Sequence, residues 1–246
     1  NMRSNINARP TNWMRAGLNI NFSYDKRQGD SNWGDSESNA TSLQGGVSYL
    51  INPLWPSIDR TTGKMYEKKF EGSNYINAHY RMANNPNDVY RYGLNFNAYF
   101  EIEPIHNLKI RTRAGSDIVF SRNSGSTIPS YAFGGGTGYR SRRFAFGYSN
   151  TITNTIEYSF SINDLHNLTL LAGQEGTRNY SESFGASSSG QIDDRLLLLQ
   201  NGKKETFSMS ESMTESRFLS FFGRLMYDFN NRYFLDFTFR NDASSR

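Results

Sequence analysis

The sequence predicts an all-β protein, an antiparallel transmembrane β-barrel segment of about eight strands. Two observations support this fold class. Apolar and polar side chains alternate over long stretches, and short turns alternate with long connections along the chain. A period of two is typical of an extended strand, because successive side chains point to opposite faces of a sheet.

The alternation is clearest in two stretches. In "MRAGLNINFSYD", residues 14–25, every even position is apolar or aromatic and every odd position is polar, charged or glycine. The stretch "YRYGLNFNAYFE", residues 90–101, repeats this pattern, and only Tyr99 breaks its polar set. Eight strands are predicted in all. They cover residues 2–9, 13–26, 89–102, 108–121, 149–162, 167–180, 217–229 and 232–241.

The connections fall into two length classes. Four are short and carry the Pro, Asn and Asp residues of hairpin turns, at residues 10–12, 103–107, 163–166 and 230–231. Three are long and rich in Gly, Ser, Asn and Asp, at residues 27–88, 122–149 and 181–216, and their pieces "FGGGTG" and "GASSSG" are expected to be the most flexible. Outer-membrane barrels have short periplasmic turns at one rim and long extracellular loops at the other. A soluble sandwich has no physical reason for this asymmetry.

Composition and strand length agree with a membrane barrel. Most predicted strands reach the ~9–11 residues that a tilted membrane strand needs, whereas globular strands cluster near ~5–6. Aromatic residues make up 15% of the 246 residues although the mean hydropathy is −0.69. The net charge of +4 is dispersed, so nucleic acid is not an expected partner, and the absence of cysteine excludes disulfides and thiolate metal sites. No apolar run approaches ~20 residues, so any membrane residence must use strands.

The two faces of the strands are assigned from the free-energy cost of placing a charged side chain in hydrocarbon. Arg and Asp cannot face hydrocarbon cheaply, so the polar face is expected to line a hydrated lumen and the apolar face to contact outer-membrane lipid. The residues expected to face lipid are Leu18, Ile20, Phe22, Leu94, Phe96, Phe100, Leu225, Leu235 and Phe237. The residues expected to face the lumen are Arg15, Asn19, Asn21, Arg91, Asn95, Asn97, Arg224 and Asp236.

The last hairpin, "SFFGRLMYDFNNRYFLDFTFRNDASSR" (residues 220–246), resembles the SusC/RagA family of TonB-dependent outer-membrane transporters of Bacteroidetes-type bacteria. That family has a strand S-x-F-G-R-x-x-Y, a short turn followed by R-Y, and then R-x-D-x-S-S-R. The stretches "ARPTNWMRAGLNINFSY" (residues 8–24) and "LLAGQE" (residues 170–175) also resemble it, whereas Asn241 and Ala243 depart from its commoner Arg and Gly. The matching residues of the hairpin are Phe222, Gly223, Arg224, Tyr227, Arg232, Tyr233, Arg240, Asp242, Ser244, Ser245 and Arg246.

The resemblance implies a larger barrel of about 22 strands that encloses a plug. Alternation is already present at Met2 and the chain stops at Arg246, so we expect residues 1–246 to be an internal part of the barrel domain of a longer protein, without its plug. The family implies active import of an oligosaccharide or peptide across the bacterial outer membrane. It also implies a SusD-like substrate-binding lipoprotein as lid, and TonB acting through the absent N-terminal part.

Two tryptophans in the first long connection are the candidate substrate contacts. Trp33 and Trp55 each offer an indole face that can stack on a sugar ring and an N–H that can donate a hydrogen bond. The alternative is that they only pack the loop around "YLINPLWPSID", residues 49–59.

The sequence points to no enzyme, metal or cofactor. The three histidines stand singly, and Asp193-Asp194 with Asp30 and Asp35 lacks the EF-hand pattern for Ca²⁺. No nucleophile is paired with a base in the sequence. Two functions compete with import: a passive porin or small stand-alone outer-membrane barrel, since eight strands suffice for closure, and a soluble β carbohydrate-binding module.

Overall fold

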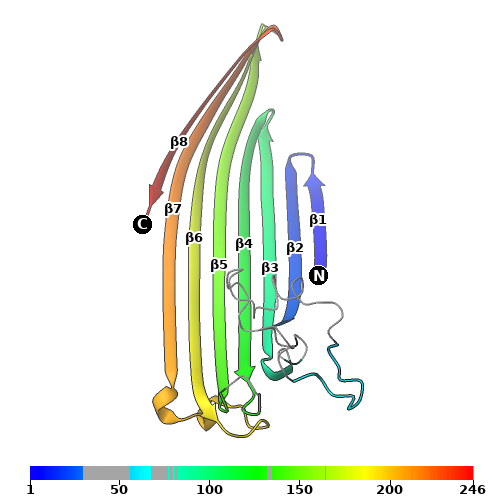
Figure 1. Cartoon of the computed structure of the whole chain (residues 1–246). Helices are drawn as coiled ribbons and strands as arrows, with labels where there is room; N and C mark the ends of the chain where they lie inside the picture. Colours follow the sequence, from blue (N-terminus) through cyan, green and yellow to red (C-terminus); the bar gives the residue numbers. More distant parts are fainter. Residues whose placement is uncertain are drawn as a thin grey trace.

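The computed structural model describes residues 1–29, 56–67, 77, 80, 83–131, 135–163 and 165–245. They form one antiparallel sheet with the strand order β1 to β8, so every strand pairs with its neighbours in the sequence (Figure 1). Two short 3₁₀ helices, η1 (Leu199–Asn201) and η2 (Lys204–Thr206), precede the seventh strand. The strands are β1 (Met2–Thr11), β2 (Met14–Gly29), β3 (Asn87–Ile105), β4 (Leu108–Thr127), β5 (Gly138–Ile162), β6 (His166–Gln191), β7 (Ser208–Phe229) and β8 (Tyr233–Ser244).

The predicted strand order and loop asymmetry are confirmed. The turns after β1, β3, β5 and β7 are short and lie at one end of the sheet, whereas the longer connections lie at the opposite end (Figure 1). Asn107, Asn163, Asn230 and Asn231 have positive φ angles and all lie in these short turns. Asn enters this left-handed region more readily than most other side chains, which explains why it recurs there.

The strands extend further toward the long connections than predicted. β5 starts at Gly138 instead of residue 149, β6 runs to Gln191 instead of residue 180, and β7 starts at Ser208 instead of residue 217. The stretch "GASSSG", expected to be a flexible loop, is therefore part of β6, where Gly185 pairs with Arg143. These extensions lack apolar alternation, but backbone pairing does not require it, so the hydrogen-bonded ladder continues beyond the pattern.

The cross-strand register gives the sheet two chemically different faces. One hydrogen-bonded row contains Leu18, Ala98, Ala114, Ile152 and Gly176 and continues to Leu219 on β7. We call the face that carries this row the apolar face. The next row, starting with Asn19 and Asn97, lies on the opposite, polar face. All residues expected to face lipid share the apolar face, and all those expected to face the lumen share the polar face.

The apolar band crosses the hydrogen-bonded rows diagonally. On β2 the band is centred near Leu18. The hydrogen-bonded row through Leu18 reaches β8 at Ala243, but the apolar residues of β8 are at 233–239, closer to the β7–β8 turn. The shift is about one residue per strand, which is the stagger that tilted strands of a barrel require. Figure 1 shows a corresponding stagger: the β3–β4 turn lies above the β1–β2 turn, and the β5–β6 and β7–β8 turns lie above both.

No second layer covers the apolar face in the described part of the chain. The only hydrophobic residues buried there are Tyr80 and Tyr131, which precede β3 and follow β4, while Phe100 and Phe237 remain 46% and 61% exposed. A soluble sandwich would bury such residues between two sheets. The described residues therefore do not form the two packed sheets that a sandwich-type soluble module would have. No helix within the described ranges is long and apolar enough to span a membrane.

Candidate functional site on the polar face

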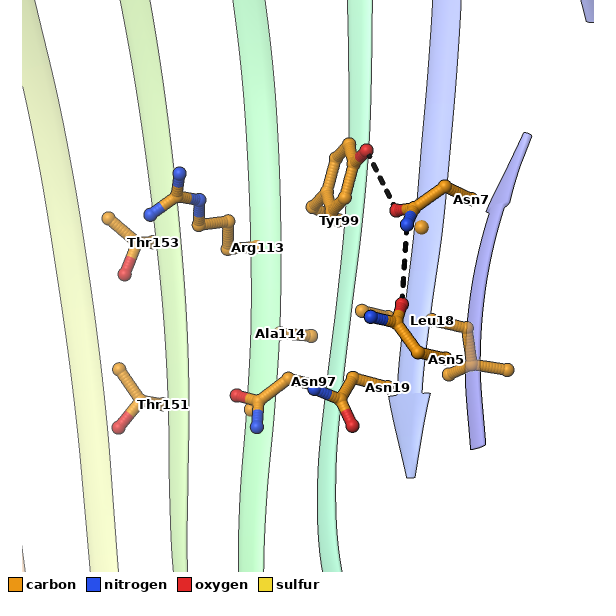
Figure 2. A pocket seen from close by; sticks show the side chains of 13 residues that line it. Asn5, Asn7, Leu18, Asn19, Asn97, Tyr99, Arg113, Ala114, Thr151 and Thr153 are labelled. Carbon is orange, nitrogen blue, oxygen red and sulfur yellow. Dashed lines mark hydrogen bonds between the residues drawn. The ribbon is translucent and has the colours of Figure 1, made fainter. Parts of the chain in front are cut away.

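A recess of about 470 Å³ lies on the polar face of β1 to β5 (Figure 2). One hydrogen-bonded row across it contains Asn5, Asn19, Asn97, Gly115 and Thr151, each from a different strand. Backbone pairing thus places three amide side chains side by side. Amides offer both donors and acceptors, so the recess is suited to a polar ligand that needs both.

The neighbouring row shapes the recess. A side chain at Gly17 would collide with the ring of Tyr99, so the glycine makes room for this ring on the polar face. The Tyr99 hydroxyl donates a hydrogen bond of 3.3 Å to Asn7 Oδ1, and Asn7 Nδ2 donates one of 3.3 Å to Asn5 Oδ1 (Figure 2). Tyr99, the residue that breaks the polar alternation, thereby orients the amides of β1.

Among the described residues that line the recess, Arg113 is the only one with a charged side chain. In the described part of the chain it forms no ion pair and lies beside Thr153, directly opposite Tyr99 in the register. The recess therefore favours a neutral ligand rich in hydrogen-bonding groups, such as a sugar or a peptide backbone. It also provides one position where a carboxylate would be stabilised.

A charged cluster borders the recess on the side of the short turns. Glu101 is 4% exposed and accepts a 2.6 Å hydrogen bond from Arg111 Nε, while Arg15 Nη1 lies 3.5 Å from its other oxygen. Nearby, Lys109 Nζ lies 3.4 Å from Glu157 Oε1. Both carboxylates are thus paired with cations inside the cluster, although its three cations outnumber them by one, and the cluster forms a structural border of the recess.

The predicted lumen residues are spread along the polar face. Asn19 and Asn97 line the recess, and Arg15 belongs to the charged cluster. Arg224 and Asp236 form a separate ion pair between β7 and β8, with Nε 3.0 Å from Oδ1. The remaining three lie beyond the recess toward the long connections: Asn21 and Asn95 pair with each other, and Arg91 pairs with Asp25 in the register.

The two candidate tryptophans, Trp33 and Trp55, lie outside the described residues. Sequence reasoning missed Asn5, Asn7 and Arg113, although the polar parity of their strands places them on the same face as Asn19. What the sequence lacked was the register that brings them together.

The loop acids serve local structure. Asp194 accepts a 3.0 Å hydrogen bond from the backbone N–H of Ser130. This bond links the connection between β6 and β7 to the connection between β4 and β5. Hydrogen bonds from the Arg195 side chain, and then from its backbone N–H, lower the pKa of Asp193 below its usual range. Within the described ranges, no group of three or more His, Cys, Asp or Glu residues could hold a metal ion.

The fold and this face define a class of protein. A single staggered antiparallel sheet, apolar on one face and amide-rich on the other, is a segment of the wall of a transmembrane β-barrel with a polar interior.

Comparisons with known proteins agree with this class. No family model matches the chain. It is 25% identical over 251 residues to "TonB-dependent receptor P26" of Formosa agariphila, covering 99% of this chain and 24% of that protein. The solved RagAB peptide transporter is 31% identical with a TM-score of 0.84, and the RagAB peptide importer in its "open-open" state is 30% identical with the same TM-score. Each match covers 99% of this chain and 27% of that chain.

The chain is therefore SusC/RagA-like, and the resemblance seen in its sequence to a barrel segment of TonB-dependent transporters is confirmed. It spans about a quarter of the length of the relatives it matches.

Proposed function

We propose that residues 1–246 form part of the barrel domain of an outer-membrane importer of the TonB-dependent SusC type. In this proposal the apolar face contacts lipid and the polar face lines the import pathway. The observation that carries it is the diagonal apolar band on one face of a sheet whose other face is amide-rich and charged over β2 and β3. The similarity to a TonB-dependent receptor and to a peptide transporter supports import over a passive pore.

The proposed cargo is an oligosaccharide or a peptide. Both present alternating donors and acceptors that match the amides of Asn5, Asn19 and Asn97, and Arg113, which forms no ion pair with a described residue, additionally suits a peptide carboxylate. A SusD-like lipoprotein is the proposed lid, and TonB is the proposed source of energy for release into the periplasm. Trp33 and Trp55 remain proposed substrate contacts.

Cysteine labelling tests which face meets lipid. Residues 1–246 contain no cysteine, so Phe96→Cys and Asn97→Cys each introduce one thiol into this segment, on adjacent residues of opposite faces. Any cysteine elsewhere in the full-length protein is first replaced by serine. In the full-length protein in outer membranes, we expect a water-soluble maleimide to label the Asn97→Cys variant. A fluorophore attached to the thiol of the Phe96→Cys variant should be quenched by brominated lipid. Equal labelling of both variants by the aqueous reagent would contradict the assignment.

Uptake measurements test the recess. Asn19→Leu combined with Asn97→Leu removes two amides, each worth about 1 kcal/mol, so we expect the KM for uptake to rise roughly thirtyfold. Asn241→Leu removes an amide from the apolar face of β8 and is the matched control, expected to leave uptake unchanged. Uptake that persists after TonB is deleted would instead favour a passive pore.

A further inference from the structure

A groove of about 730 Å³ lies on the apolar face across β5 to β8. Its floor is one hydrogen-bonded row of Ile152, Gly176, Leu219 and Ala243. A side chain built at Gly176 would have no heavy atom within 4 Å of its Cβ, so the groove is open above this residue. The floor is apolar and wide enough for a hydrocarbon chain, which is what this face is proposed to contact.

The rim toward the long connections carries two arginines. Arg178 and Arg217 are directly opposite each other on β6 and β7, a pairing of like charges that is unfavourable by itself. Both donate to the same oxygen, Glu215 Oε1, over 2.9 and 2.7 Å. Arg178 also lies 5.8 Å from the ring centroid of Tyr148. Two guanidinium groups thus share one carboxylate, which leaves a net positive charge and unused N–H donors at the rim.

The groove also contains amides where hydrocarbon is expected. Gln174 has no side-chain hydrogen bond to any described residue, and Asn154 uses only its oxygen, which accepts a 2.9 Å bond from the Thr112 hydroxyl. Polar groups that face hydrocarbon without a partner are costly. A ligand with its own polar groups next to its acyl chains would satisfy them.

We propose that this groove binds a phosphate-bearing lipid of the leaflet on the long-connection side. The phosphate lies against Arg178 and Arg217, an acyl chain lies over Gly176, and ester or hydroxyl groups of the lipid meet the Gln174 amide. Guanidinium groups match phosphate with two parallel hydrogen bonds each, and charge complementarity with the arginines selects an anionic headgroup. The adjoining apolar floor selects a lipid over free phosphate. This inference rests on the proposed membrane location of the protein.

The test uses the full-length protein purified from outer membranes and reconstituted in nanodiscs with a phosphorylated lipid A. Native mass spectrometry counts the lipid molecules retained. Arg178→Gln combined with Arg217→Gln removes the charge, and we expect retention to fall roughly tenfold, the effect of about one charge-assisted hydrogen bond. Gly176→Leu fills the open space without a clash and keeps both arginines, and it should reduce retention similarly.

Lys26→Gln is the matched control, since Lys26 is a cation on the apolar face of β2, outside the groove, and lies 5.6 Å from the Tyr90 ring centroid. We expect it to retain lipid as the unmodified protein does. Equal retention in all variants, equal binding of dephosphorylated lipid A, or displacement of the lipid by inorganic phosphate would each overturn the inference. Absence of the unmodified protein from outer membranes would instead overturn the proposed function on which it rests.

Discussion

Replacing Phe96 by arginine tests the central assignment of the two faces. Phe96 lies in the middle of the apolar run of β3 and is flanked by Ile20 and Ser116 on the neighbouring strands. An arginine that faces lipid at the midplane of a barrel destabilises the folded protein, so that the free energy of unfolding falls by about 2–4 kcal/mol. We expect this loss for Phe96→Arg.

The same change near the membrane surface should cost less. Ile102 lies on the same face six residues further along β3, which is about 20 Å along the strand and about 15 Å in depth for a strand tilted by ~40°. That exceeds half of an apolar band of about 25 Å, so arginine at this depth costs only about 0–1 kcal/mol. On the polar face, Asn97→Arg loses the 2.8 Å hydrogen bond to Asn95 Oδ1, worth about 1 kcal/mol.

The assay is denaturant unfolding of the full-length protein from phospholipid vesicles, followed by tryptophan fluorescence, with each variant compared at the unmodified protein's midpoint. The expected order of destabilisation is Phe96→Arg well above Ile102→Arg and Asn97→Arg. Equal losses at Phe96 and Ile102 would show that no depth-dependent lipid environment exists. A larger loss at Asn97 than at Phe96 would reverse the two faces and refute the reasoning.

Three further predictions concern the charged cluster, a turn and a loop. Glu101→Gln leaves Arg15 and Arg111 without the carboxylate that they share. We therefore expect the free energy of unfolding to fall by about 1–3 kcal/mol in the same assay, and by less for Arg15→Gln. Asn231 has a φ of 52°, so Asn231→Val should lower stability by about 1–2 kcal/mol whereas Asn231→Gly should not. The backbone N–H of Thr61 donates a hydrogen bond to the Asp59 carboxylate and lowers the pKa of Asp59. The ionised carboxylate therefore stabilises this turn at neutral pH, and the stabilisation is lost as the pH falls below about 4 and the carboxylate is protonated. Hydrogen exchange of residues 56–67 should therefore accelerate at low pH, after correction for intrinsic rates, and Asp59→Asn should remove that dependence.

Much of the fold could be predicted because strand alternation is a local property. The side chains of residues 14–25 alternate whatever they pair with, so the sequence alone indicated the strands, their order and the two faces. The hairpin turns were equally local, since the left-handed backbone of Asn230 and Asn231 depends on the residue type. The extensions of β5 to β7 were missed because Ser- and Gly-rich strands with two polar faces have no alternation to detect.

What the sequence determined by itself was the two-faced character of each strand, because a period of two separates apolar from polar side chains before any strand has a partner. Only the tertiary structure decided which residues meet. The recess joins Asn5, Asn19 and Asn97, and the groove joins Gly176 and Arg178 of β6 to Arg217 of β7, through the register between neighbouring strands. The physical reason is that register is a property of pairs: a shift of one residue exchanges the faces, and no pattern within a single strand records it.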